Sequence, residues 1–87
     1  MKKMDTFTLV MTGSLKAYDQ VLKSLGNTYF DFVISKKFKI GNKGYIYFEF
    51  DNEAIDVYTI PTIEYLYEQV NMLQESGEQA VINMIQA

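Results

Sequence analysis

Hydrophobic and polar residues alternate near the start of the chain. Within residues 6–12, Phe7, Leu9 and Met11 fall on one side of an extended backbone and mainly threonine falls on the other. Alternation with a period of two predicts a strand with one buried face. Ser14 follows as a suitable N-cap, so we expect a helix to begin directly after this strand.

The next apolar residues recur at helical spacing. They are Leu15, Tyr18, Val21, Leu22 and Leu25. This spacing predicts an amphipathic helix with one face toward the core. Gly26-Asn27 then supplies residues that favour a helix C-cap.

Residues 28–40 are rich in β-forming side chains. Apolar residues of one parity predict one face of a strand; they are Phe30, Phe32, Ile34, Phe38 and Ile40. Lys36 has the same parity and interrupts the apolar series, which indicates a β-bulge or a bend.

A turn and a second strand come next. The segment 41–44, Gly-Asn-Lys-Gly, predicts a tight hairpin turn. Residues 45–50 return as a strand with Ile46, Phe48 and Phe50 facing inward. A short third strand of this meander is expected at residues 55–59.

The C-terminal part begins with a second helix near Pro61, a residue that favours the first turn of a helix. Its apolar stripe is Ile63, Leu66, Tyr67, Val70 and Leu73. The segment 76–79 fits a capping box that would open a short final helix through residues 81–85. Two alternatives stay open: one long helix through Gly77, or a strand over residues 80–85.

These elements together predict the order β-α-β-β-(β)-α-α. We expect an α+β fold in which helices pack on one face of an antiparallel sheet, with residues 1–87 forming a single domain. If residues 80–85 form a strand, the order becomes the ferredoxin-like βαββαβ.

Composition narrows the chemistry. The chain contains neither cysteine nor histidine, which removes thiolate nucleophiles, His-based acid–base pairs and the commonest transition-metal ligands. The acidic turn at residues 49–56 lacks the glycine and the final glutamate of an EF-hand loop. We therefore expect a non-enzymatic protein with no cofactor and no metal.

No uninterrupted apolar run is long enough to span a membrane. The two lysines near the N-terminus are not followed by the apolar segment of a signal peptide. These observations predict a soluble, cytoplasmic protein.

Charge divides the chain into two halves. Residues 1–43 carry eight lysines and three aspartates, whereas residues 44–87 carry eight acidic residues and no basic residue. Such asymmetry indicates charged partners.

The acidic half supplies the first functional hypothesis, a surface that imitates the phosphates of a nucleic acid and docks on a basic protein. The expected partner-binding residues are Glu49, Asp51, Glu53, Asp56, Glu64, Tyr65, Glu68 and Glu75. The partner would be a nucleic-acid-handling protein that this chain inhibits or regulates. In size and acidity the chain is similar to small anti-defence proteins of phages and mobile elements, such as inhibitors of CRISPR effectors, a similarity carried by no motif.

The lysine-rich hairpin supplies the alternative, a nucleic-acid-binding domain. Its candidate residues are Lys36, Lys37, Lys39 and Lys43, with Phe38, Tyr45 and Tyr47 nearby. Lysines neutralise phosphates and exposed aromatic rings stack on bases. A homodimer is compatible with either hypothesis, because the halves have opposite charge and tyrosines are predicted on the outer face of the sheet.

Overall fold

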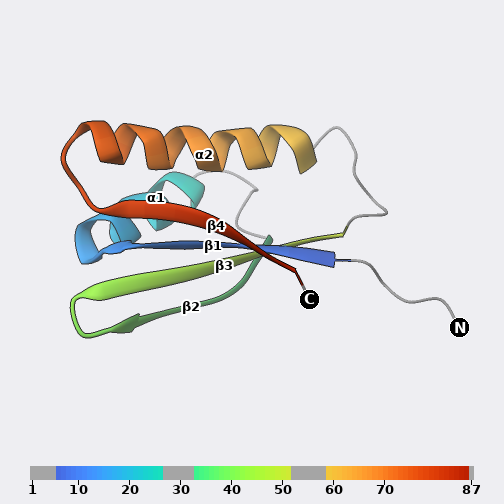
Figure 1. Ribbon diagram of the computed structural model, residues 1–87, viewed down its shortest axis with the longest axis horizontal. Coiled ribbons are helices and arrows are strands. Elements are labelled where there is room, and N and C mark those ends of the chain that lie inside the picture. Colours follow the sequence, from blue (N-terminus) through green and yellow to red (C-terminus); the bar gives the residue numbers. More distant parts are fainter. Residues whose placement is uncertain (1–5, 27–32, 52–58, 87) are drawn as a thin grey trace, which may run out of the picture.

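The protein is an antiparallel sheet with two helices on one of its faces (Figure 1). The computed structural model describes residues 6–26, 33–51 and 59–86. The elements, in chain order, are β1 (Thr6–Ser14), α1 (Leu15–Gly26), β2 (Ile34–Ile40), β3 (Lys43–Asp51), α2 (Thr59–Glu75) and β4 (Ala80–Gln86). The strands lie in the order β2-β3-β1-β4, which is a ferredoxin-like arrangement. The α+β class and the one-sided packing of the helices are confirmed.

The side chain of Ser14 stabilises the turn from β1 into α1. The Ser14 hydroxyl accepts a hydrogen bond from the backbone N–H of Ala17 at 3.1 Å, which is the expected N-cap contact. The same hydroxyl donates to Glu78 Oε1 at 3.0 Å. Ser14 therefore begins the helix and also ties it to the segment that leads into β4.

The β2–β3 hairpin closes through a two-residue turn, Gly41-Asn42, because Ile40 pairs with Lys43. Gly41 has a φ of +61°, the conformation that a type II′ turn requires at its first central position. Gly44 belongs to β3 and not to the turn. A Cβ added to Gly44 would lie 2.4 Å from the Tyr18 ring, so glycine here lets α1 approach the sheet.

The expected final helix is wrong, and the strand alternative is right. Residues 80–86 pair with residues 7–13 of β1 without interruption. Gly77, with a φ of +88°, ends α2: the N–H of Glu78 bonds to the carbonyl of Leu73 and that of Gly77 to the carbonyl of Gln74. These two bonds form a Schellman motif. Ser76, the first residue of the expected capping box, caps no helix; its hydroxyl donates a hydrogen bond to the carbonyl of Met72 within α2.

The core lies between the sheet and the two helices. Its largest fully buried side chains on the sheet include Leu9, Met11, Ile46 and Phe48, and α2 contributes Leu66. Each of these residues has the parity or helical position that the sequence pattern assigns to the core. Of the short strand expected at 55–59, residues 55–58 lie outside the described residues and Thr59 is the first residue of α2.

Neither helix in the described ranges is long and apolar enough to cross a membrane.

Candidate nucleic-acid interface

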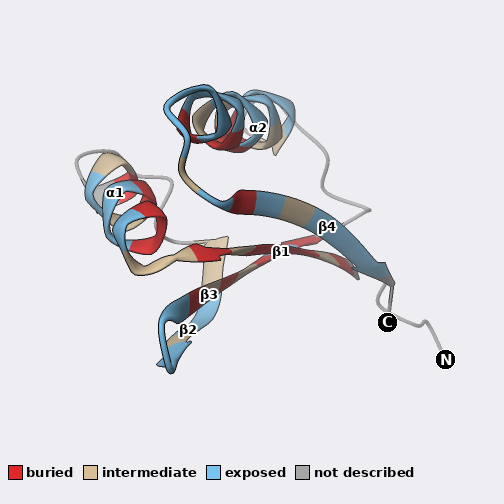
Figure 2. Cartoon of the chain, turned by 60° about the vertical axis from the view of Figure 1, so that its left-hand side comes forward, coloured by how far each residue is buried: buried red, intermediate tan, exposed pale blue. Residues whose placement is uncertain are grey.

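The side of the sheet that faces away from α1 and α2, termed the open face, is covered by no described helix (Figure 2). Cross-strand pairing arranges its side chains in rows that run from β2 to β4. The two central rows are Phe38, Tyr45, Thr12 and Val81, and Lys36, Tyr47, Val10 and Asn83. The sheet therefore brings residues from all four strands onto one face, where Val10 is buried and the other seven side chains are exposed or half-buried.

Three aromatic rings and one ammonium group are in contact on this face. The rings of Phe38 and Tyr45 stack with centroids 5.0 Å apart, and those of Phe38 and Tyr47 stack at 6.0 Å. Lys36 Nζ lies 4.8 Å from the centroid of the Tyr47 ring and 5.9 Å from that of Phe38, which are cation–π distances. We term these four residues the aromatic cluster. All three rings are half-buried, so each keeps part of its surface exposed to solvent.

A β-bulge places the cluster on the open face. The register of β2 on β3 shifts between Ile34, which pairs with Phe48, and Lys36, which pairs with Tyr47. The Ser35 hydroxyl donates to the carbonyl of Tyr47 at 3.3 Å within this irregularity. The irregularity expected at Lys36 is thus confirmed.

The expectation that Ile34, Phe38 and Ile40 share a face is wrong for the same reason. The extra residue reverses the alternation, so Ile34 packs against the core while Phe38 and Ile40 lie on the open face. Strict alternation along the sequence assigns the wrong face to every residue after a bulge, because the bulge adds one residue to the strand.

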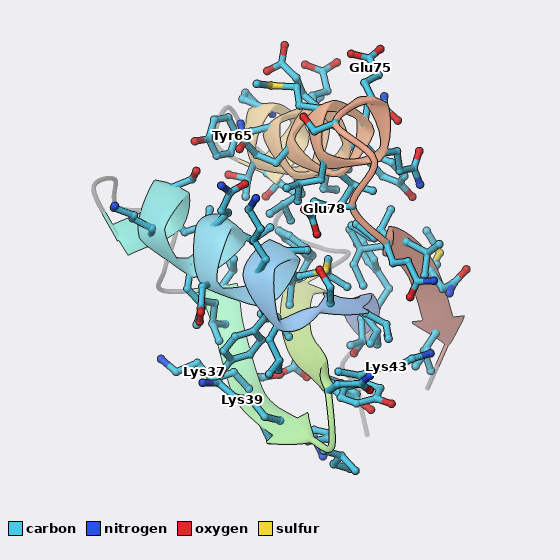
Figure 3. The ribbon with its side chains drawn as sticks, turned by 90° about the vertical axis from the view of Figure 1, so that its left-hand side faces the viewer. Lys37, Lys39, Lys43, Tyr65, Glu75 and Glu78 are labelled. Atoms are coloured by element: carbon cyan, nitrogen blue, oxygen red, sulfur yellow. The ribbon has the colours of Figure 1, made fainter. Side chains whose placement is uncertain are left out.

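The four lysines of the hairpin divide between the two faces. Lys36 and Lys43 lie on the open face, in register with Tyr47 and with Ile40. Lys37 and Lys39 point to the other side, as Figure 3 shows for Lys37, Lys39 and Lys43. Lys39 Nζ lies 5.4 Å above the ring of Tyr18 on α1. All four side chains are exposed, so the hairpin carries positive charge along its edge as well as on its open face.

The carboxylates of α2 form a separate surface. Glu64, Glu68 and Glu75 are exposed on this helix, which carries no basic residue. Tyr65 is half-buried and packs against the core. With Pro61, Glu64 and Glu68 it lines a shallow hollow on the outside of the helix. The structure therefore brings Glu64, Tyr65 and Glu68 together.

Of the other acidic candidates, Glu49 does not join that surface. Glu49 lies on the open face of the sheet, where it pairs with Thr8, on the opposite side of the molecule from α2. Asp51 is the last residue of β3, while Glu53 and Asp56 lie outside the described residues. Glu78 pairs with Lys16, at 3.5 Å between Nζ and Oε2.

The lysines of the β2–β3 hairpin and the glutamates of α2 thus occupy different ends of the molecule. Figure 3 shows Lys37, Lys39 and Lys43 on the β2–β3 hairpin and Glu75 on α2, with α1 and β1 between them. The net charge of −3 therefore does not describe the surroundings of the aromatic cluster. Over the hairpin itself, four lysines stand against Glu49 and Asp51.

This arrangement supplies rings for stacking and cations for binding phosphates, the two contacts that single-stranded nucleic acids use. Within the described ranges, no group of three or more carboxylates is placed to hold a metal ion.

No family model matches the chain, and no characterised protein or solved structure matches it.

Proposed function

We propose that the protein is a non-enzymatic binding module that takes single-stranded nucleic acid on its open face. The aromatic cluster is the observation that carries this proposal. It combines two tyrosine rings that both stack on Phe38 with an ammonium group on the same face. A ring on an unpartnered sheet face can stack with any base, because every base has a π-face.

Single-stranded substrates fit this surface better than a duplex does. The bases of a single strand are available for stacking, whereas those of a duplex are already stacked on one another. In the part of the chain that the structure describes, the open face is a sheet and presents no helix for a duplex groove.

Charge supports an orientation for the bound strand. Lys36 and Lys43 stand on the open face, and Lys37 and Lys39 extend from the neighbouring edge. The carboxylates of α2 lie in the opposite layer, where they repel phosphates. The backbone of the bound strand is therefore expected to follow the hairpin, with its bases over Phe38, Tyr45 and Tyr47.

The test is fluorescence anisotropy with labelled single-stranded RNA and DNA oligonucleotides, titrated between about 50 and about 200 mM salt. If four lysines neutralise four phosphates, log K falls against log salt with a slope of about −3, since each contact to a single strand contributes about −0.7. Tyr47→Leu keeps an apolar side chain but removes stacking, and is expected to weaken binding by about fivefold or more, since each stacked base contributes roughly 1–3 kcal/mol.

A matched pair of charge reversals locates the site. Lys36→Glu is expected to abolish binding at the higher salt concentration. Lys23→Glu makes the same charge change at an exposed side chain of α1, away from the open face, and should have a much smaller effect. Absence of binding to every oligonucleotide, or equal losses in these two variants, would contradict the proposal.

A second candidate function rests on α2. Three exposed glutamates on a helix without basic residues favour docking on a basic protein surface, with electrostatic steering of the encounter. In that function the protein would be a cytoplasmic inhibitor or regulator of a nucleic-acid-handling protein, of the phage or mobile-element anti-defence type.

Affinity capture with two charge-reversed baits separates the candidates. Glu64→Lys/Glu68→Lys should lose a partner held by α2, whereas Glu49→Lys, on the open face, should retain it. A partner that both baits retain would exclude α2 as its docking surface.

A further inference from the structure

The outer edge of β4 lacks the features that prevent edge strands from pairing. β4 is the last strand in the sheet order β2-β3-β1-β4, and its sequence is Ala-Val-Ile-Asn-Met-Ile-Gln. It contains no charged residue and no proline, and its pairing with β1 is continuous, without a bulge. Charges, prolines and bulges are the usual means by which edge strands avoid other strands.

Exposed apolar side chains gather along this edge. Val81, Met84 and Ile85 are 49%, 55% and 46% exposed, with Met84 on the helix side of the sheet and the other two on the open face. Figure 2 shows most of β4 as exposed beside the mostly buried β1.

The neighbouring flank of α2 continues this apolar surface. Ile60, Tyr67 and Gln74 follow one another at seven-residue spacing, so they lie on one side of the helix. That side faces β4, because Gln74 Nε2 donates to the carbonyl of Ala80 at 2.6 Å. Ile60 and Tyr67 are exposed. Among the described residues, five of the seven large exposed apolar side chains therefore lie along the β4 edge.

The backbone of β4 also presents hydrogen-bonding groups outward. Ser14 N–H bonds to the carbonyl of Gln79, and bonded positions alternate along an antiparallel ladder. Val81, Asn83 and Ile85 therefore direct their N–H and C=O groups toward β1. Ile82 and Met84 direct theirs away from the sheet, where no described strand pairs with them.

We infer that the partner of this edge is a second copy of the same chain, paired β4 to β4 in antiparallel orientation about a two-fold axis at Asn83. In this register Ile82 bonds to Met84 of the second copy, and Val81 lies opposite its Ile85. Apolar residues meet apolar residues on both faces of the joined sheet. A two-fold pairing is closed, so it ends at the dimer.

Charge favours a second copy as the occupant. The chain carries a net charge of −3, so two copies repel least when the surfaces in contact carry no charge. β4 and the Ile60–Tyr67–Gln74 flank have no charged side chain. The glutamates of α2 lie outside this flank, so the dimer buries none of them against one another.

The dimer has a defined architecture. The sheet becomes continuous, in the order β2-β3-β1-β4-β4-β1-β3-β2, and both open faces lie on the same side of it. The two aromatic clusters then face the same direction across a shared surface. The pairing itself does not depend on nucleic-acid binding.

Sedimentation equilibrium of nuclease-treated protein over a wide concentration range tests the inference. The wild type should approach twice 10.1 kDa. Ile85→Lys places an unpaired charge opposite Val81 of the second copy, where its burial is costly, and should raise the dissociation constant about a hundredfold or more. Ile40→Lys makes the same change at a more exposed site on the opposite edge and should remain dimeric.

A second variant pair tests the backbone. Met84→Pro removes an N–H that points away from β1, so the fold should persist while the dimer dissociates. Ile85→Pro removes an N–H that bonds to β1 and should destabilise the monomer. Amide hydrogen exchange gives an independent readout: the N–H groups of Ile82 and Met84 should be protected in wild type and exchange rapidly in Ile85→Lys.

Three results would overturn the inference. The first is a wild-type protein that stays at 10.1 kDa at every concentration. Binding of an extended peptide from another protein to β4 of that monomer would also count against the inference. The second is a dimer that survives both Ile85→Lys and Met84→Pro. The third is equal dissociation by Ile40→Lys and Ile85→Lys. Loss of the dimer with intact oligonucleotide binding would leave the proposed function standing, and the reverse result would leave the dimer standing.

Discussion

The two edge strands of the sheet, β2 and β4, differ in how well they are protected against pairing with other strands. β2 carries Lys36, Lys37 and Lys39 within seven residues and contains the bulge at Ser35. β4 has the same length, no charge and an unbroken ladder. Since charged side chains and bulges discourage pairing, β2 is protected against other strands and β4 is not. The lysines that protect β2 are also the ones assigned to phosphate binding in the proposed function, so one set of side chains would serve both purposes.

Removing the lysines of β2 should produce the largest effect. In a Lys36→Thr/Lys37→Thr/Lys39→Thr variant both edges would be uncharged. Each β4 dimer could then add further copies through β2, and the assembly would no longer close. We expect particles larger than a dimer that grow with concentration, measured by light scattering.

The matched control removes three lysines from other positions, namely Lys16, Lys23 and Lys43. It has the same net charge but leaves the β2 lysines in place, so it should retain the wild-type size. A β2 variant that also retained the wild-type size would show that the bulge alone protects this edge.

Two glycines differ in what keeps them from being replaced. Gly44 is limited by close packing against α1, and Gly77 by its backbone conformation at the end of α2. Gly44→Ala should lower the free energy of unfolding by about 3 kcal/mol, because the new Cβ would overlap the Tyr18 ring. Gly77→Ala meets no atom within 4 Å but must adopt a φ of +88°, which costs about 1 kcal/mol. Urea denaturation measures both values. Equal losses would mean that α1 shifts to accommodate the side chain.

The smallest effect is expected at the bulge. Ser35→Ala removes the hydrogen bond to the carbonyl of Tyr47 and should lower the free energy of unfolding by about 0.5 kcal/mol, as is typical of an exposed hydrogen bond. Ser76→Ala, which removes the bond to Met72 O at the turn before β4, should have a similar effect. Urea midpoints of the two variants test this. A larger loss for Ser35→Ala would show that the hydroxyl determines the register of β2.

Elements whose signals are local can be predicted from neighbouring residues alone. Alternation at Phe7, Leu9 and Met11 predicts β1, the Gly41 turn predicts the hairpin, and Ser14 predicts the start of α1. Each depends on neighbouring residues, because side-chain period, turn conformation and capping are short-range properties. The candidate tyrosines of β3, Tyr45 and Tyr47, could be assigned to the outer face for the same reason.

Tertiary structure decided the features that depend on a distant partner. Residues 80–86 carry apolar side chains that fit a helix as well as a strand, and pairing with β1, 67 to 79 residues earlier, selects the strand. The faces of Lys36 and Phe38 depend on the register of β2 against β3. Backbone hydrogen bonds between strands determine both outcomes, and their partners cannot be identified from the residues on either side of a position.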